Sequence, residues 1–222
     1  MPHNQPAAAQ RHNMRGHLIM AFALIALAFT ALPSMAFAGT DTAGNVFVSD
    51  GDSSPSGVGG DLYWAGQSLS LDDASIDRDI IAAGESLSIR DCTVGGAVRL
   101  AARTIDIAKT TIDGSVTVAA QHVVLNSGST ANCFYAAGET VALRGSAKSA
   151  VLAGSTVTID GTVDGDVEVW ADKLVLGKNA NITGTVNAHV SQDPERADGA
   201  KVGALKIDRT ENEDTSTVND VI

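Results

Sequence analysis

A polar and apolar pattern of about eighteen residues recurs seven times between Asp61 and Val190. The first four units are DLYWAGQSLSLDDASIDR, DIIAAGESLSIRDCTVGG, AVRLAARTIDIAKTTIDG and SVTVAAQHVVLNSGSTAN. Three less even units follow, which are CFYAAGETVALRGSAKS, AVLAGSTVTIDGTVDG and DVEVWADKLVLGKNANITG. A fixed period of this length indicates a repeat architecture, in which each unit stacks on its neighbours.

Apolar residues, nearly all aliphatic, occupy equivalent positions in successive units. The first column contains Leu62, Ile80, Val98, Val116, Phe134, Val151 and Val167. The second contains Leu69, Leu87, Ile105, Val123, Val141, Val157 and Leu174. The third, two residues later, contains Leu71, Ile89, Ile107, Leu125, Leu143, Ile159 and Leu176. A fourth, near the end of the unit, contains Ile76, Val94, Ile112, Val163 and Ile182. Spacing by two is the strand period, so each unit is predicted to form three short strands with inward apolar faces.

The predicted fold is therefore all-β, a right-handed triangular parallel β-helix (β-solenoid) of about seven short rungs. Asp-Gly pairs such as Asp113-Gly114, Asp160-Gly161 and Asp164-Gly165 are expected at corners with positive φ. A left-handed hexapeptide helix fits less well, because the apolar sites come in pairs and not at every sixth residue. A β-sandwich remains an alternative, although it does not require columns at a fixed period.

Residues 1–38 have the pattern of a secretory signal peptide. Arg11 and Arg15 precede an apolar run from Leu18 to Leu32, and a small-residue site, Ala36-Phe37-Ala38, precedes Gly39. An uncleaved N-terminal membrane anchor is the alternative, since the uncharged segment is just long enough to span a bilayer. Both interpretations predict an exported protein of the cell envelope, either secreted or membrane-anchored.

The segments on either side of the repeat differ from it in composition. Residues 39–60 form a Gly/Ser/Asp-rich linker, in which Val46 to Val48 could add a partial strand. The repeat occupies residues 61–190. Residues 191–222 form a polar, acidic C-terminal tail, with an extra strand considered at 201–208.

Without residues 1–38 the chain has 13 basic and 26 acidic residues, a formal charge of −13. Nucleic acid and anionic lipid headgroups are therefore not expected partners, and the acid excess is interpreted as a solvated surface, with loose divalent-cation binding as the alternative.

The cysteines and aromatic residues are interpreted as structural. Cys92 and Cys133 are too many rungs apart to form a disulfide, with Cys92 buried and Cys133 at a more exposed corner. Core filling is predicted for Trp64, Phe134 and Trp170.

The sequence offers no catalytic, cofactor-binding or metal-binding site, and the protein is not expected to be an enzyme. The two histidines of the repeat, His122 and His189, are several rungs apart. The acidic residues Asp72, Asp73, Asp77 and Asp79 gather near the first corners, where a solvated surface is the simplest interpretation. A polysaccharide lyase would need longer rungs and loops that wall a cleft.

The stretch from Ala150 to Ala188, AVLAGSTVTIDGTVDGDVEVWADKLVLGKNANITGTVNA, resembles the bactofilins, which are polymer-forming bacterial β-solenoid proteins. The resemblance extends over about Asp61 to Val190 and is weaker in the earlier rungs. It implies a right-handed triangular solenoid that assembles end to end without nucleotide and acts as a cytoskeletal scaffold. The export signal is a departure from that family and would make this chain an exported variant.

The expected function is that of an exported, polymer-forming structural scaffold of the cell envelope. The partner is a second copy of the chain, in an end-to-end homo-oligomer or filament, since a solenoid end presents unpaired backbone groups. The residues expected to mediate self-association are Leu62, Tyr63, Trp64, Leu69, Leu71, Ile182 and Val186. The alternative is a surface module that binds envelope polysaccharide or protein along a flat face, and the N-terminal segment is a further candidate for membrane contact.

Overall fold

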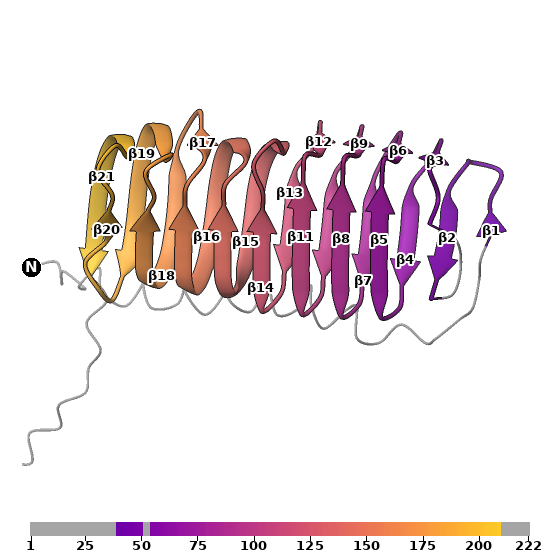
Figure 1. Cartoon of the computed structure of the whole chain (residues 1–222), viewed down its shortest axis with the longest axis horizontal. Coiled ribbons are helices and arrows are strands. Elements are labelled where there is room, and N and C mark those ends of the chain that lie inside the picture. Colours follow the sequence, from indigo (N-terminus) through magenta and orange to yellow (C-terminus); the bar gives the residue numbers. More distant parts are fainter. Residues whose placement is uncertain (1–38, 51–53, 210–222) are drawn as a thin grey trace, which may run out of the picture.

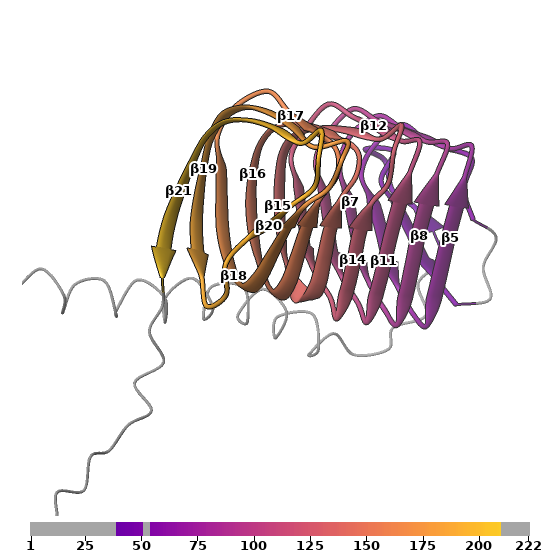
Figure 2. The same cartoon turned by 60° about the vertical axis from the view of Figure 1, so that its left-hand side comes forward.

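The apolar columns are stacks of parallel strands in the computed structural model, which describes residues 39–50 and 54–209. Leu62 pairs with Ile80, Ile80 with Val98, and Val98 with Val116, so equivalent residues of successive units lie directly beside one another. The structure is a β-solenoid of about nine turns, without a helix among these residues. Figure 1 shows the turns side by side along the long axis, and Figure 2 shows the same stack obliquely.

Each complete turn contributes strands to three faces. The first face contains β2 (Val46–Ser49), β4 (Leu62–Ala65), β7 (Ile80–Ala83), β10 (Val98–Ala101) and β13 (Val116–Ala119). The second contains β5 (Ser68–Asp72), β8 (Ser86–Arg90), β11 (Thr104–Ala108), β14 (His122–Leu125) and β20 (Glu195–Arg196). The third contains β3 (Gly57–Val58), β6 (Ser75–Ile76), β9 (Thr93–Val94), β12 (Thr111–Ile112) and β17 (Thr162–Val163). Five longer strands continue around corners and extend the faces: β15 (Thr130–Leu143), β16 (Ser146–Ile159), β18 (Val167–Leu176), β19 (Asn181–Val190) and β21 (Lys201–Arg209).

The stacked strands extend beyond residues 61–190 at both ends. Strand β2 pairs with β4, which places a partial turn from the expected linker over the first repeat. Strand β21 pairs with β19 and adds the strand that was considered at 201–208. The sequence gives only a weak signal for these two end strands, because the residues beside each of them do not follow the eighteen-residue period.

The core is a continuous apolar column inside the solenoid. Inward residues such as Leu71, Ile89, Ile105 and Val116 are at most 1% exposed, while their neighbours along each strand face outward. Burial of this aliphatic surface contributes roughly 25 cal/mol per Å² to folding. The alternation confirms the second, third and fourth columns of the sequence pattern.

One residue of the first column was assigned wrongly. Phe134 pairs with Ala150, not with Val151, and Ala150 pairs with Val167. Val151 faces outward, whereas Leu152 is fully buried. Sixteen residues separate Phe134 from Ala150, instead of the eighteen of the earlier turns. Because strand side chains alternate between faces, the one-residue misassignment of this strand exchanged its inward and outward side chains.

Trp170 is also a correction, because it lies on the outer surface and not in the core. It pairs with His189 in the outward register of the first face, and the two rings stack with centroids 5.3 Å apart. Trp64 and Phe134 are buried as expected, at 4% and 0% exposure.

The Asp-Gly corners owe their glycines to close packing and not to positive φ. Among the described residues, positive φ occurs at Asp73, Asp91 and Lys109 and at three other glycines. A Cβ added to Gly114 would lie 2.5 Å from the backbone oxygen of Gly96 in the preceding turn. The corner glycines therefore permit neighbouring turns to approach at their sharpest bends.

Side chains at another corner cap the backbone of the next turn. Asn45 Oδ1 accepts a hydrogen bond from the N–H of Asp61, Asp61 Oδ1 from that of Asp79, and Asp79 Oδ1 from that of Ala97. Burial acts to raise the pKa of Asp79, but the Ala97 N–H and the Arg99 guanidinium outweigh it and hold the pKa below its ordinary value. This ladder satisfies corner N–H groups that no strand pairs.

Candidate functional site

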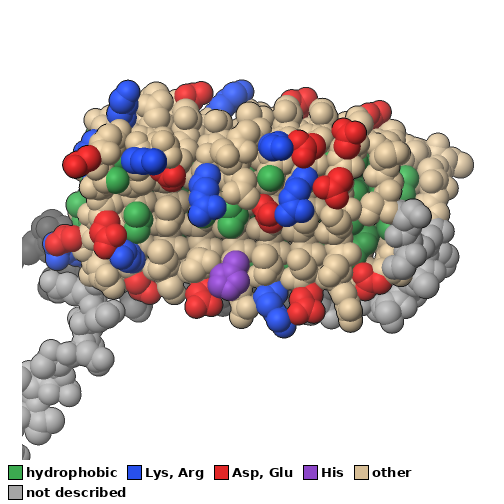
Figure 3. All heavy atoms as spheres, in the orientation of Figure 1, with side chains coloured by type: hydrophobic (Ala, Val, Ile, Leu, Met, Phe, Trp, Pro, Cys, Tyr) green, Lys and Arg blue, Asp and Glu red, His purple; other side chains and the backbone are tan. Residues whose placement is uncertain are grey.

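The sides of the solenoid carry interspersed charges. Basic and acidic side chains alternate over the face shown in Figure 3. Several form ion pairs between adjacent turns, including Arg78 with Asp61, Arg90 with Asp106 and Arg103 with Glu85. The more exposed of these pairs, such as Arg103 with Glu85, contribute about 0–1 kcal/mol each. This pattern is that of a solvated surface, so the two ends of the solenoid are the more informative regions.

The N-terminal end is partly closed by a short strand. Strand β1 (Gly39–Thr40) pairs antiparallel with the outer edge of β2, with Gly39 beside Phe47 and Thr40 beside Val46. The Asp41 carboxylate holds the connecting turn, accepting hydrogen bonds from the N–H groups of Ala43 and Asn45. These bonds, that of Asn45 above all, keep the pKa of Asp41 below its ordinary value.

The C-terminal end is open along β21. One edge of this strand pairs with β19, and no described strand pairs with its other edge. Leu205 and Ile207 continue the inward register of Val186 and Ala188, yet Ile207 is 46% exposed. A long strand edge with apolar residues beside it is a surface that favours pairing with another strand.

The residues predicted for self-association lie one turn inside these ends. Leu62, Trp64, Leu69, Leu71, Ile182 and Val186 are 0–4% exposed, and β2 or β21 covers those on the first face. Tyr63 is half-buried and stacks on Phe47, with centroids 4.9 Å apart. Beyond them along the stack lie Val46 and Phe47 of β2 at one end and Leu205 and Ile207 of β21 at the other. The apolar alternation in VFV and ALKI was the available signal, but two short segments do not establish a period.

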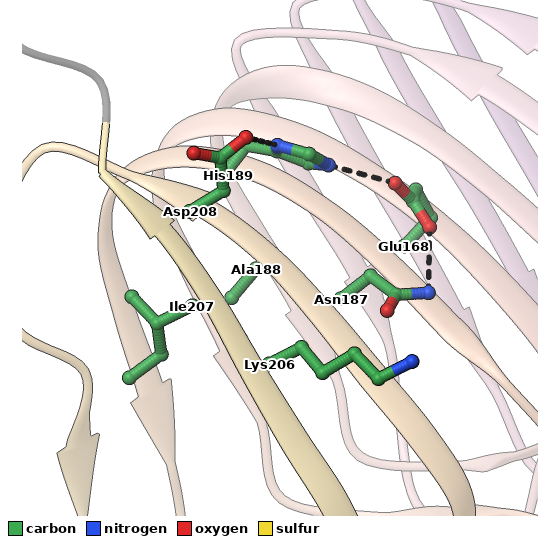
Figure 4. Close-up of a pocket in the computed structure, with 7 residues that line it drawn as sticks. All are labelled: Glu168, Asn187, Ala188, His189, Lys206, Ile207 and Asp208. Atoms are coloured by element: carbon green, nitrogen blue, oxygen red, sulfur yellow. Dashed lines mark hydrogen bonds and ion pairs between the residues drawn. The ribbon is translucent and has the colours of Figure 1, made fainter.

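A polar cluster lies beside the open end, around a shallow pocket (Figure 4). His189 Nε2 is 2.9 Å from Glu168 Oε1, and His189 Nδ1 is 3.3 Å from Asp208 Oδ2. Asn187 Nδ2 donates to the other Glu168 oxygen at 3.1 Å. These residues come from β18, β19 and β21, so the cluster connects the last three strands of the first face. Sequence reasoning treated His189 as an isolated solvated residue, because Glu168 and Asp208 lie about one repeat away in either direction.

This cluster is arranged to hold strands together and not to bind a metal. Glu168 and Asp208 engage opposite nitrogens of the His189 ring, so the three groups cannot converge on one ion. Within residues 39–50 and 54–209, no three His, Cys, Asp or Glu side chains form a group suited to a metal. The stacking of Trp170 on the imidazole fixes the ring further.

A column of hydroxyl side chains follows the outer surface of the third face. It contains Ser75, Thr93, Thr111, Thr130, Ser146 and Thr162, which pair in register from turn to turn. All are exposed except Thr162, which is partly buried. This column was not predicted from the sequence, although its members follow the repeat. Such columns also stabilise strand pairing by themselves, because Thr and Ser fit exposed strand positions.

Both cysteines are free thiols in different environments. Cys92 is buried as expected, in a corner stack with Thr110, and burial raises the pKa of its thiol. Cys133 is partly buried, and the hydroxyl of Ser149 donates to its sulfur at 3.3 Å. That hydrogen bond is the main reason that the pKa of Cys133 is lowered.

We expect an alkylating reagent at neutral pH to modify Cys133 at least about tenfold faster than Cys92. A change of one pKa unit changes the thiolate fraction about tenfold, and burial also blocks access to Cys92. Peptide mass spectrometry after timed alkylation measures both rates in one sample. In urea above the unfolding midpoint the two rates should converge, and equal rates in the native protein would contradict this assignment.

Comparison with known proteins finds no match: no family model, no curated protein and no solved structure is similar to the chain. The class of protein therefore rests on the fold, which is a parallel β-solenoid built from repeats.

Proposed function

We propose that the protein is an exported, non-enzymatic β-solenoid that serves as a structural scaffold of the cell envelope and self-associates through its ends. The observation that carries this proposal is the outer edge of β21, with which no described strand pairs, and where Leu205 and Ile207 continue the core beyond the last complete turn. Each strand hydrogen bond formed there contributes about 1 kcal/mol, in addition to the apolar burial.

The resemblance of the Ala150–Ala188 stretch to the bactofilins supports the same proposal, because that family assembles from solenoid ends. The arrangement of the sides agrees with it as well. They carry solvated charges and a shallow pocket whose polar groups bind one another, which is the pattern of a structural module.

The proposed export rests on residues 1–38, which lie outside the described residues. In the described part of the chain, no helix has the length and apolar character needed to cross a membrane. We expect Gly39 to be the first residue of the protein isolated from cells. N-terminal mass spectrometry measures this directly, and a retained Met1 in an envelope fraction would favour the membrane-anchor alternative.

Self-association is tested with the full chain purified in mild detergent. Light scattering and sedimentation velocity over a hundredfold range of concentration should show a mass that rises with concentration. A chain that remains monomeric over the whole range would overturn the proposal.

The exposed hydroxyl column of the third face favours a second candidate function, the binding of polysaccharide along the solenoid. Hydroxyl groups one turn apart, about 4.8 Å, present a regular row of donors and acceptors. Co-sedimentation with insoluble envelope polysaccharide tests this candidate. Binding should disappear when Thr93, Thr111 and Thr130 are all replaced by valine, which keeps the β-branched shape and removes the hydroxyls.

A further inference from the structure

The hydrogen-bond directions of the inner turns identify which backbone groups of β21 point away from β19, toward the open edge. Leu62 N–H donates to Asp79 O, Ile80 N–H to Ala97 O, and Val98 N–H to Ser115 O, always toward the next turn. Leu205 occupies this same register, through Val167 and Val186. Since alternate residues of a strand point their N–H groups to the same edge, the N–H groups of Leu205, Ile207 and Arg209 face the open edge.

The two ends of the solenoid are not equivalent as partners for this edge. Stacking one copy on another from tail to head would place β21 against the outer edge of β2. That edge already pairs with β1 at Val46 and Phe47, and the turn that follows β1 is fixed by Asp41. Tail-to-head growth must therefore displace β1, whereas a second β21 edge carries no described strand to displace.

We propose that two copies join at their C-terminal ends in a closed two-fold pair, with the β21 edges paired antiparallel. The proposal rests on the self-association proposed above and names its partner, a second copy in the opposite orientation. A two-fold axis perpendicular to the first face keeps the inward side chains of both copies inward. The pair is closed because it uses the open end of each copy and leaves the β1-capped ends outside.

The side chains of β21 favour one register of this pairing. Inward residues must lie opposite inward residues, so Ile207 can lie on the two-fold axis, Leu205 can lie on it, or Leu205 can lie opposite Ile207. With Leu205 on the axis, Ile207 lies opposite Gly203, so the Ile207 side chain gains no apolar partner across the pair. With Leu205 opposite Ile207, Lys206 lies opposite Lys206, a like-charge contact that is destabilising in a strand pair. With Ile207 on the axis, Lys206 of each copy lies opposite Asp208 of the other. Figure 4 shows Lys206, Ile207 and Asp208 in sequence along β21.

The register is tested by a disulfide trap in the full chain in mild detergent, with Cys133 replaced by serine. In antiparallel strands, directly opposite residues that exchange hydrogen bonds have Cα atoms about 5.5 Å apart, which a disulfide can bridge. The Ile207→Cys variant should therefore form a covalent dimer under mild oxidation. The matched control is Phe47→Cys at the other end, which should stay uncrosslinked. Crosslinking that requires a mixture of the two variants would instead show tail-to-head contact and overturn the closed pair.

Sedimentation velocity then separates the closed pair from self-association in general. The unsubstituted chain should stop at a dimer. Ile207→Pro removes an N–H from the open edge without removing a bond to β19, and it should weaken dimerisation by at least about tenfold. Lys206→Glu should weaken it as well, and Lys206→Glu combined with Asp208→Lys should restore it. Circular dichroism and urea unfolding of each variant confirm that the solenoid remains folded.

The outcomes have different meanings for the two proposals. Dimers that these substitutions weaken and restore support both. Polymers longer than a dimer would overturn the closed pair while leaving self-association standing. If Ile207→Pro does not weaken dimerisation, the contact lies elsewhere and the pairing through β21 is overturned. Monomers at every concentration would remove both proposals.

Discussion

Replacing Phe134 with alanine should lower the free energy of unfolding by about 3–5 kcal/mol, the range found for large aromatic residues in protein cores. Phe134 is fully buried, in β15, and pairs with Val116 on one side and Ala150 on the other. The small Ala150 side chain leaves the ring as the main filler of this layer. Truncation therefore creates a cavity that the rigid strand stacks on either side cannot close.

Urea unfolding followed by far-ultraviolet circular dichroism measures this effect. The matched control is Val151→Ala, because the sequence pattern placed Val151 in the same column as Phe134. Since Val151 faces outward, its truncation should cost less than about 1 kcal/mol. A cost for Val151→Ala equal to that for Phe134→Ala would restore the sequence-based register and contradict the pairing of Phe134 with Ala150.

Introducing proline at Val98 should destabilise the solenoid by about 3 kcal/mol or more. Val98 lies in β10, between β7 and β13, and its N–H donates to Ser115 O at 3.0 Å. Proline removes that donor, leaves the Ser115 oxygen unpaired and takes the valine side chain out of the core. Each turn contacts chiefly its neighbours, so the defect should also reduce the cooperativity of unfolding between the two halves.

The appropriate comparison is Ile207→Pro, the same residue type introduced at the end of the stack. Its N–H faces the open edge of β21, so the change in unfolding midpoint of the monomer should be small beside that of Val98→Pro. Thermal unfolding at a concentration below dimerisation gives both midpoints. Similar losses for the two variants would indicate that Ile207 N–H pairs within the monomer, contrary to its assigned direction.

The distribution of hydrogen bonds also explains why the ends, and not the sides, are candidates for assembly. Inside the stack, corner carboxylates such as Asp61 and Asp79 satisfy the N–H groups that strands leave unpaired. The N-terminal edge receives β1 and the Asp41 turn. Among the described residues, only the C-terminal end presents a long strand edge that neither a capping carboxylate nor another strand covers.

Much of this fold follows from the sequence because each turn of a solenoid repeats the same inward and outward positions. A side chain that is inward at Leu69 is inward at Leu87 and Ile105, so the period alone identifies most of the core. The prediction failed where the period changed. Between Phe134 and Ala150 the unit shortens by two residues, and only the pairing of whole strands decides that Ala150 and Leu152, and not Val151, enter the core.

The sequence by itself determined the architecture: stacked parallel turns around an aliphatic interior, with charged side chains outside. The reason is that inward positions recur at the strand period, and burial of apolar surface selects a single register for them. Only the tertiary structure decided the features that depend on contacts between turns. These include the cap of β1 on β2, the meeting of Glu168, His189 and Asp208, and the open edge of β21. The polar cluster joins residues about one repeat apart, and the β1 cap lies outside the period, so the geometry of both is set by how the last turns at each end stack.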